Sequence, residues 1–579
     1  MKKKLGALLL ATVCAFSTMA TACGDNSGNG NGDGDWEYNV YTSSKTRIVV
    51  ANTDGGVGSD WIKEAAERFA KLKKDEHYES NKTGIFIDIE QGLGLDLSNA
   101  AQGSPNIYFG ERKWDASSLA QSGQVLDITD IVTDTTREGG SIESVINPQM
   151  LEFCKGFDGK YYALPNVEFF GGISYDVDVF NECNAWFASE DETAVNAYNS
   201  KYGSANFVAN STAKKSKGPD GKAGTEDDGM ACSLEELLIL FSYFKDRTEY
   251  SPITMSGKYV NYSNYLLVSL WASLAGTEQM TNYYNCTGEI DIVTGYTNEN
   301  LFPGVDYIKK PIVETVTMKD DGSDGYKGSM MAAKYYAMAI LEVVNKEFFS
   351  PDAFTDTITH WDAQRALIFN PVDTRYSKTA MLIDASYWYN EAESAGSFEL
   401  YQQMSADKAE RNIRMMRLPS CYYTKDLKET TNTLLDIGQG VGVIAANVAG
   451  DAGLTRACKE FLAFLYTEEE LKAFTACTGV SRPLNYEMSE ADMASKSGFQ
   501  RDVWNYSHVT GNVVYYSGTT EAFKRAKRYL CLTLTLPNKP IYNEKQHEGF
   551  LTPLRGGANT QSLFTSNQYS QATWMQIMG

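Results

Sequence analysis

The chain has 579 residues, of which 43% are hydrophobic and 12% aromatic, enough apolar surface to build a large core with two or more lobes. Its 74 acidic residues outnumber its 52 basic ones and give a formal net charge of -22. Such an acidic surface disfavours nucleic acid and anionic lipid head groups, so we expect no nucleic-acid partner and a neutral or weakly cationic one.

The amino terminus is typical of an exported protein. Lysines at positions 2 to 4 precede an apolar run from Leu5 to Phe16 and small residues up to Ala22. This is the pattern of a secretory signal peptide over residues 1–22. The apolar run is shorter than the roughly 20 residues that cross a bilayer, so we expect no spanning helix.

The stretch from Ala20 to Cys23, "ATAC", resembles a bacterial lipobox, in which the cysteine is lipidated and becomes the new amino terminus. A lipobox usually has leucine where this chain has Ala20. Ordinary cleavage that leaves Cys23 free is the alternative. Residues 23–45 open with a Gly-, Asn- and Asp-rich segment that suits a flexible tether. We therefore expect a lipid at Cys23 that anchors the protein on the outer face of the bacterial plasma membrane.

The first folded elements alternate between strand and helix patterns. The β-branched run Thr46–Asn52 predicts a buried strand, and Trp61–Lys74 has the apolar stripe of a surface helix. The segment Thr83–Glu90 predicts a second strand. Strand, helix and strand in this order form a βαβ unit, which indicates an α/β fold with a parallel sheet covered by helices.

Further elements follow an acidic, Gly-rich insertion at about residues 184–232. A helix is predicted from Ser233, because Glu236 lies at the capping-box spacing before an apolar run. Strands are predicted at Thr379–Ala385 and Gly440–Ala446, and one helix at Ala457–Phe474. No repeat of solenoid period is present.

Short catalytic signatures are absent. The four histidines show no metal-ligand spacing, and GxSxG, HExxH, the P-loop and a GxGxxG followed by a helix are all missing. Eight scattered cysteines remain besides Cys14 and Cys23, without a CxxC pair, so we expect buried free thiols. A glycoside hydrolase stays possible, because its carboxylate pair has no short signature. The 35 tyrosines, 26 phenylalanines and 9 tryptophans modestly favour sugar binding.

The order of several segments resembles a known family. The segments are "IVVANTDGG", "TGIFIDI", "SPNIYFGERKWDASSLAQSGQVLDITD", "DGKYYALPNVEFFGGISYDVDVFN", "TAMLIDASYWYNEAE", "MMRLPS", "VGVIAAN" and "ACKEFLAFLYTEEELKAFTACTGVSRPL". Together they resemble extracellular solute-binding protein family 1, the substrate-binding lipoproteins of carbohydrate ABC transporters, which includes the maltose-binding protein.

The resemblance implies an α/β clamp of the periplasmic-binding-protein type, type II, with two lobes that each hold a mainly parallel sheet flanked by helices. Lobe 1 would take residues 46–167 and 433–480, and lobe 2 residues 168–432 and 481–579. A carbohydrate would lie between the lobes and pass to an ABC permease without chemistry. The resemblance implies a monomer with no required cofactor.

Six ligand contacts are implied at strand ends and at the crossing between the lobes: Asp54, Glu111, Trp114, Glu168, Tyr387 and Trp388. One extra residue near Glu111 leaves the register of that loop open. Asp54 could instead belong to a turn, and Glu168 could be a solvated carboxylate at the hinge. Either ring at positions 387 and 388 could pack in the core.

The acidic loop "GPDGKAGTEDDG" resembles a compact calcium site of some members of this family. Asp220, Asp227 and Asp228, with the carbonyl groups of Lys222 and Thr225, would supply the hard oxygen ligands that calcium prefers. The EF-hand pattern does not fit, because its third and twelfth positions lack oxygen-bearing side chains here. A Gly-rich acidic turn on the surface is the alternative.

Two other functions remain open at this stage. One is a surface glycoside hydrolase, which would release reducing ends from its ligand. The other is a binding lipoprotein that serves a sensor or adhesion system without a permease.

Overall fold

The structure is a computed structural model that describes residues 36–53, 55–92, 95–110, 115–192, 196–210, 214–370, 372, 375–406, 408–423, 426, 432–438, 440–510, 512–530 and 550–579. The predicted signal peptide, Cys23, Asp54, Glu111 and Trp114 lie outside the described residues. Within these ranges, no helix combines the length and the apolar character that crossing a membrane requires.

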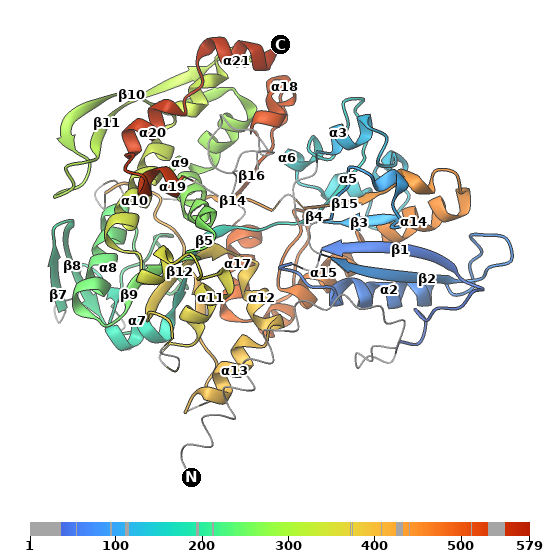
Figure 1. Ribbon diagram of the computed structural model, residues 1–579, viewed down its shortest axis with the longest axis horizontal. Coiled ribbons are helices and arrows are strands. Elements are labelled where there is room, and N and C mark those ends of the chain that lie inside the picture. Colours follow the sequence, from blue (N-terminus) through green and yellow to red (C-terminus); the bar gives the residue numbers. More distant parts are fainter. Residues whose placement is uncertain are drawn as a thin grey trace.

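Two sheets organise the molecule, one on each side of the view in Figure 1. The five-stranded sheet has the order β2-β1-β3-β15-β4 and belongs to lobe 1. Its strands are β1 (Thr46–Thr53), β2 (Ile85–Gly92), β3 (Ile107–Phe109), β4 (Leu164–Val167) and β15 (Gly440–Ile444). Strands β2 and β3 pair with β1 in parallel, and β15 runs antiparallel between β3 and β4.

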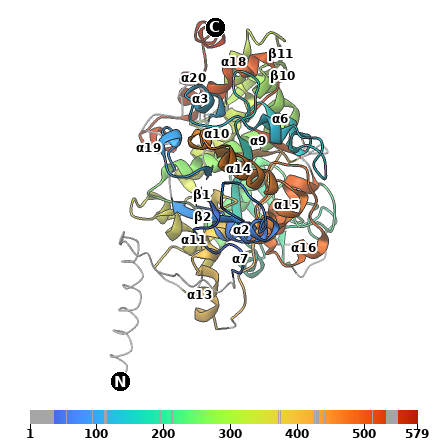
Figure 2. The same cartoon turned by 90° about the vertical axis from the view of Figure 1, so that its right-hand side faces the viewer.

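Helices cover the sheet of lobe 1, and Figure 2 shows α14 above and α2 below β1 and β2. They are α2 (Asp60–Leu72), α3 (Ala116–Gln121), α4 (Thr129–Val132), α5 (Ile142–Val145), α6 (Pro148–Leu151), α14 (Ala452–Phe464) and α15 (Glu468–Thr478), with short 3-10 turns η1 (Ala100–Gln102) and η6 (Ala446–Val448). The predicted stripe of α2 is buried except for Leu72, which is exposed. Trp61, in the first turn of α2, is also buried and packs edge-on against Phe109 and Phe474.

The four-stranded sheet of lobe 2 has the order β13-β5-β12-β9. Its strands are β5 (Gly171–Asp176), β9 (Ser251–Thr254), β12 (Thr379–Ala385) and β13 (Ile413–Met415). Every residue of β12 is buried, and β12 pairs in parallel with β9 and antiparallel to β5.

The other described elements lie outside the two main sheets. The helices and turns are α7 (Val177–Cys183), α8 (Leu234–Arg247), η2 (Val260–Tyr262), α9 (Ser263–Asn285), η3 (Gly325–Met330), α10 (Ala332–Glu347), η4 (Pro351–Phe354), α11 (His360–Ile368), α12 (Trp388–Ser394), α13 (Ser397–Met404), α16 (Glu490–Ala494), α17 (Gly498–Trp504), the π-helical turn η7 (Asn505–Val509), α18 (Glu521–Leu530), α19 (Leu551–Arg555), α20 (Thr560–Ser566) and α21 (Gln571–Met578). The smaller strands are β6 (Trp186–Phe187), β7 (Asn196–Ser200), β8 (Gly203–Val208), β10 (Gly288–Asn300), β11 (Lys309–Met318), β14 (Leu434–Asp436) and β16 (Val513–Tyr515).

The chain passes between the lobes through two neighbouring strand connections, the first from β4 to β5 and the second from β14, which pairs with β16, to β15. Strand β4 of lobe 1 leads into β5 of lobe 2, and β14 leads back into β15, which places β4, β5 and β14 at the centre of Figure 1. The two connections are joined because Phe169 N–H donates to Asp436 and Ile437 N–H donates to the carbonyl of Phe169, at 2.9 and 2.7 Å.

The structure confirms the α/β clamp, with two differences from the sequence prediction. The sheets contain more antiparallel pairs than a βαβ pattern suggests, because strands adjoining the crossings join both sheets. The single helix predicted at Ala457–Phe474 is two helices, since Thr467 caps α15 by accepting a bond from Glu470 N–H. As predicted, Ser233 caps α8 by accepting from Glu236 N–H at 3.2 Å, and the Glu236 carboxylate accepts from Cys232 N–H at 2.7 Å.

Candidate functional site

Glu168 lies at the first crossing and bridges the two lobes. It is 1% exposed. From the lobe 1 side, its carboxylate accepts a hydrogen bond from the hydroxyl of Ser481, and its N–H donates to the Ser481 carbonyl at 3.1 Å. From the other side, the hydroxyl of Tyr515 donates to it at 3.2 Å, and His508 Nδ1 lies 3.5 Å away. Glu168 is therefore a buried junction residue and not the solvated carboxylate of the alternative interpretation.

The segment after Ser481 stays with lobe 1 beyond the predicted boundary at residue 480. Asn485 N–H donates to the Val145 carbonyl, and Leu484 pairs with Ile146. The fully buried Arg482 lies over the rings of Trp61 and other aromatic residues of lobe 1. The chain thus leaves lobe 1 only after this segment.

Burial shifts the ionisation of the two titratable groups at this junction in opposite directions. It raises the pKa of Glu168 to about 7 from an ordinary 4.5, against the hydrogen bonds of Ser481 and Tyr515, which lower it. It lowers the pKa of His508 to about 4 from 6.5, because the charged imidazole loses its hydration.

Half-buried aromatic side chains form a continuous row on lobe 2. The aromatic row consists of Tyr259, Tyr262, Tyr265, His360, Trp361 and Tyr387. Tyr262 stacks on His360 with ring centres 5.8 Å apart and 22° between the planes. Tyr265 meets Tyr262 edge-on at 5.2 Å, and its hydroxyl lies 2.8 Å from that of Tyr387.

Local structure brings these rings together from three elements. The first three tyrosines surround η2 and the first turn of α9, and His360 and Trp361 open α11. Thr359 fixes the start of α11 through a capping box with Asp362. Tyr387 follows the end of β12, at the strand-end position that α/β folds use for ligands.

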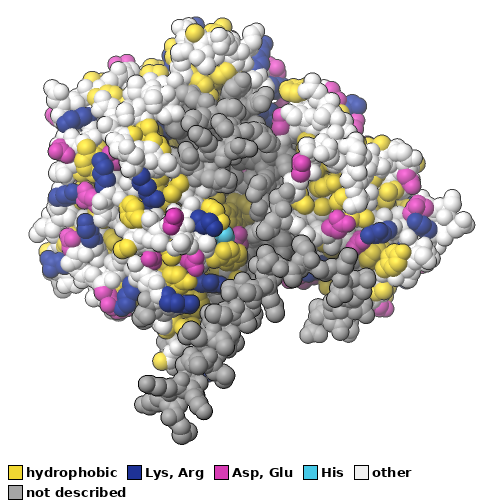
Figure 3. All heavy atoms as spheres, viewed as in Figure 1, with side chains coloured by type: hydrophobic (Ala, Val, Ile, Leu, Met, Phe, Trp, Pro, Cys, Tyr) yellow, Lys and Arg dark blue, Asp and Glu magenta, His cyan; other side chains and the backbone are white. Residues whose placement is uncertain are grey.

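Lobe 1 contacts the row at Tyr387. Gly56, in the loop after β1, has φ +72°, and a Cβ there would lie 2.8 Å from the Cβ of Tyr387. Asn390 of α12 donates to the Gly56 carbonyl at 3.2 Å and also to that of Thr478. The ring of Phe169, on the crossing, meets Tyr387 edge-on at 5.0 Å. The row therefore ends where the two lobes and the crossing meet, and Figure 3 shows hydrophobic side chains on both sides of the lobe boundary.

No family model matches the chain, and no curated protein matches it in sequence. Among solved structures, the SBP RafE in complex with raffinose aligns with 92% of this chain and all of its own, with a TM-score of 0.50 and 10% identity. A chitin oligosaccharide binding protein aligns with 91% of this chain and all of its own (TM-score 0.49, 13% identity). A putative binding protein MsmE from Bacillus subtilis in an open conformation covers 93% and 98% (TM-score 0.47, 11% identity).

This chain has the solute-binding protein fold. The raffinose complex covers nearly the whole chain, so the fold extends over both lobes and the crossings between them. At 10% identity the likeness concerns the fold alone.

The two predicted aromatic contacts after β12, Tyr387 and Trp388, differ in their burial. Tyr387 is half-buried and belongs to the aromatic row. Trp388 is fully buried, donates from its indole N–H to Ser174 at 2.8 Å and packs against Phe499. Trp388 therefore offers no face to a ligand in this arrangement and is a core residue, because helix α12 turns its side chain into lobe 2.

Sequence reasoning missed most of the row. The segment "YVNYSNY" spaces Tyr259, Tyr262 and Tyr265 by three residues, which puts them on one side of a helical turn. That spacing could have predicted that the three tyrosine rings lie on the same side of the chain. The pairing of these tyrosines with His360 and Trp361, nearly a hundred residues later, had no counterpart in the sequence.

The acidic loop folds on itself and packs against lobe 2. The Thr225 hydroxyl lies 3.3 Å from a carboxylate oxygen of Asp220, 2.9 Å from one of Asp227 and 3.1 Å from the Lys222 carbonyl. The Asp228 carboxylate makes a different contact, because one of its oxygens accepts from the N–H of Gly224 at 2.8 Å. Such oxygens are the kind of ligand that calcium prefers, but the described residues contain no group of three or more acidic, histidine or cysteine side chains arranged for a metal.

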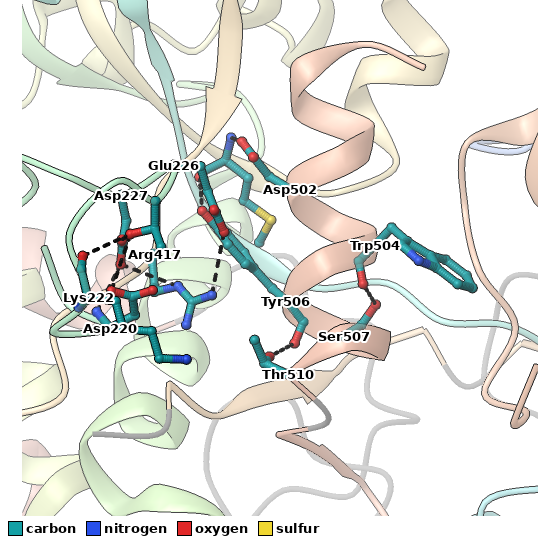
Figure 4. A network of polar contacts seen from close by, with 12 residues as sticks. Asp220, Lys222, Glu226, Asp227, Arg417, Asp502, Trp504, Tyr506, Ser507 and Thr510 are labelled. Carbon is teal, nitrogen blue, oxygen red and sulfur yellow. Dashed lines mark hydrogen bonds and ion pairs between the residues drawn. The ribbon is translucent and has the colours of Figure 1, made fainter. Parts of the chain in front are cut away.

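The loop also faces a buried arginine, as Figure 4 shows. Arg417 lies 3.5 Å from Asp227 and 3.7 Å from Glu226, and its guanidinium stands 4.3 Å from the ring centre of Tyr506 in η7. Asp227 is 1% exposed, and burial raises its pKa to about 6. Through Arg417 the loop is thus connected to η7, the π-helical turn that also contains His508 of the junction.

The burial of Trp388 gives a first prediction. Trp388→Ala removes a fully buried ring, so we expect it to lower the free energy of unfolding by about 3 to 5 kcal/mol. Urea denaturation followed by tryptophan fluorescence and circular dichroism measures this. Leu400→Ala, at an exposed position in α13, is the control and should change stability little. A Trp388→Ala protein as stable as the wild type would show that the ring is not in the core.

The junction gives a second prediction, about pH. Between about pH 4.5 and 7 Glu168 holds a proton in the folded state and not in the unfolded state, so its contribution to stability falls as pH rises. Between about pH 4 and 6.5 His508 is neutral in the folded state and charged in the unfolded state, so its contribution rises. The two effects oppose each other. We expect Glu168→Gln to steepen the rise of unfolding free energy from pH 5 to 6.5 by about 1.4 kcal/mol per pH unit.

Urea titrations at several pH values measure this slope. Glu469→Gln, at an exposed position of α15, removes the same charge and should leave the slope unchanged. An unaltered slope in Glu168→Gln would contradict the opposed titration of the two junction groups.

Calcium binding at the acidic loop stays a prediction. If Asp220, Asp227 and the Lys222 carbonyl hold calcium, millimolar free calcium raises the melting temperature and chelation lowers it again. Asp227→Asn should abolish the shift, whereas Asp320→Asn, in another exposed turn, should keep it. A melting temperature that does not change with calcium would contradict the calcium site and support the alternative, a Gly-rich acidic turn on the surface.

Proposed function

We propose that this protein is the extracellular binding component of an ABC importer for carbohydrate. It captures an oligosaccharide between its lobes and delivers it to the membrane permease as a monomer held at the cell surface by a lipid on Cys23. The solute-binding fold supports this proposal, and so does raffinose, the sugar named for a structure that shares this fold over nearly the whole chain.

The aromatic row is the observation that carries the proposal. Half-buried rings present flat apolar faces that suit the C–H faces of sugar rings, and polar groups at their edges orient hydroxyl groups. The row lies at a strand end and at two helix starts, where lobe 1 also makes contact. It continues over six side chains, so it suits a ligand of several sugar rings better than a monosaccharide.

The row and the junction together suggest how capture works. Lobe 2 carries the row, and the loop after β1 reaches it from lobe 1 beside Gly56. A sugar lying on the row would be enclosed when that loop approaches, while the joined crossings act as the hinge. Nothing in this cycle requires a covalent step.

A ligand screen tests the proposal. We expect at least one oligosaccharide to raise the melting temperature of the purified protein and to bind by calorimetry without release of reducing ends. Trp361→Ala removes one half-buried ring of the row and should weaken binding by about 1 to 2 kcal/mol with little change in stability. Phe157→Ala, which removes an exposed ring in lobe 1, should bind as the wild type does.

Other outcomes point to other functions. Sustained release of reducing ends would make the protein a glycoside hydrolase. If the protein binds a sugar but cells that carry it together with an ABC permease do not take that sugar up, the sensor or adhesion role would be favoured. A complete lack of response to oligosaccharides would contradict the carbohydrate proposal itself.

A further inference from the structure

Two side-chain amides join lobe 2 to lobe 1 beside the aromatic row. The N–H₂ group of Asn390, in α12, donates to the carbonyl of Gly56 at 3.2 Å and to the carbonyl of Thr478. The side-chain oxygen of Asn390 accepts from the N–H₂ group of Gln500, in α17, at 3.0 Å. Asn390 is 8% exposed and Gln500 is 6% exposed. This pair, Asn390 and Gln500, is called the amide catch below, because it connects two segments of lobe 1 with two helices of lobe 2.

The start of α17 fixes the direction in which both amides of the catch face. The side-chain oxygen of Gln500 accepts from the N–H and the hydroxyl of Ser497, at 3.1 and 3.2 Å, in a capping box. The nitrogen of Gln500 is therefore left to face the oxygen of Asn390. The two backbone carbonyls at the other end of Asn390 can only accept, so the N–H₂ group has to face them. The capping box thus presents both donors of Asn390 to lobe 1.

The carboxyl-terminal end of α15 forms one lobe 1 side of the catch. Thr478 is the last residue of α15, and the last four carbonyls of a helix have no partner within the helix. Gly479 ends the helix with φ +65°, and a Cβ there would collide with the side chain of Gln500. Lys496, just before α17, donates to the carbonyl of Ala476. Donors from outside lobe 1 therefore complete the end of this helix, where its dipole is negative.

The catch and the aromatic row share the first turn of α12. Asn390 follows Tyr387 by three residues, so the two side chains are neighbours on one face of that turn. Asn390 bonds the carbonyl of Gly56, and the backbone of Gly56 lies directly against Tyr387. Water can replace the lobe 1 carbonyls when the lobes separate, so each bond stabilises the closed arrangement only modestly and the catch can open.

We infer that Asn390 is a positioning residue for ligand capture, which holds the loop of Gly56 against Tyr387 and so sets the fraction of molecules in which lobe 1 closes over the aromatic row. This inference rests on the proposed function and adds the contact that controls how long the ligand is held. A ligand that needs the closed arrangement binds more weakly in proportion as that arrangement is less populated.

The separation of the lobes without ligand tests the inference directly. Phe157→Cys in lobe 1 and Leu400→Cys in lobe 2, both at exposed positions, carry the two dyes for single-molecule fluorescence energy transfer. Cys477→Ser removes an exposed native thiol. We expect Asn390→Ala to lower the ratio of closed to open molecules roughly tenfold, because two bonds between the lobes are lost.

Asn370→Ala is the matched control for the loss of a buried amide. Asn370 is 3% exposed and donates to the carbonyl of Thr379 at 2.6 Å, within lobe 2. Its replacement should lower the melting temperature and leave the lobe separation unchanged. With an oligosaccharide found in the screen, stopped-flow measurements should give a roughly tenfold faster dissociation for Asn390→Ala, little change in its association rate, and wild-type rates for Asn370→Ala.

Each outcome decides one of the two proposals. Equal lobe separations in the wild type and Asn390→Ala would overturn the inference, whatever the protein binds. A changed separation with an unchanged dissociation rate would overturn it as well, because the catch would then not act on capture. A protein that binds no carbohydrate would overturn the proposed function, while the lobe separations would still decide whether the catch holds the lobes. If Asn390→Ala does not fold, Gln500→Glu replaces the donor to Asn390 by an acceptor and should lower the ratio of closed to open molecules in the same direction.

Discussion

The buried carboxyl group of Glu168 holds the two lobes at one place, and the rest of the structure depends on it. Only two residues, 169 and 170, separate it from strand β5, and it directly follows β4. Ser481 binds it from lobe 1, while Tyr515 and His508 reach it from the other side. A polar group buried this deeply is costly unless it is bonded, so these contacts constrain how the lobes can move. Motion that keeps them is a rotation about the crossings, which is the motion a clamp requires.

The two lobes contribute different parts of the region around Tyr387. All six rings of the aromatic row belong to lobe 2, and lobe 1 contributes backbone through the loop beside Gly56. A side chain at position 56 would collide with Tyr387, so the close approach depends on glycine at a positive φ. The aromatic row is therefore built on one lobe, and the proposed closure of the other lobe would not require the row to rearrange.

Local sequence patterns predicted the elements well and the site poorly, for a physical reason. The β-branched run of β1, the amphipathic face of α2 and the alternation of strand and helix depend on near neighbours, so the sequence displays them directly. The role of an aromatic side chain depends on which way its helix turns it and on what packs there. Tyr387 and Trp388 are adjacent and equally aromatic, yet one is half-buried in the row and the other lies in the core. The row itself joins segments about a hundred residues apart, and only the tertiary fold brings His360 against Tyr262.

The acidic loop is connected to the Glu168 junction through a chain of side-chain contacts. Asp227 faces Arg417, and the guanidinium of Arg417 lies on the ring of Tyr506. Tyr506 and His508 belong to the same π-helical turn, and His508 lies 3.5 Å from Glu168. Removing the charge of Asp227 would leave Arg417 with Glu226 as its remaining described ion-pair partner, and a buried guanidinium whose ion pairing is reduced destabilises the residues that pack on it. The loop therefore stabilises the lobe 2 side of the junction through a chain of contacts, whether or not a calcium ion strengthens its own fold.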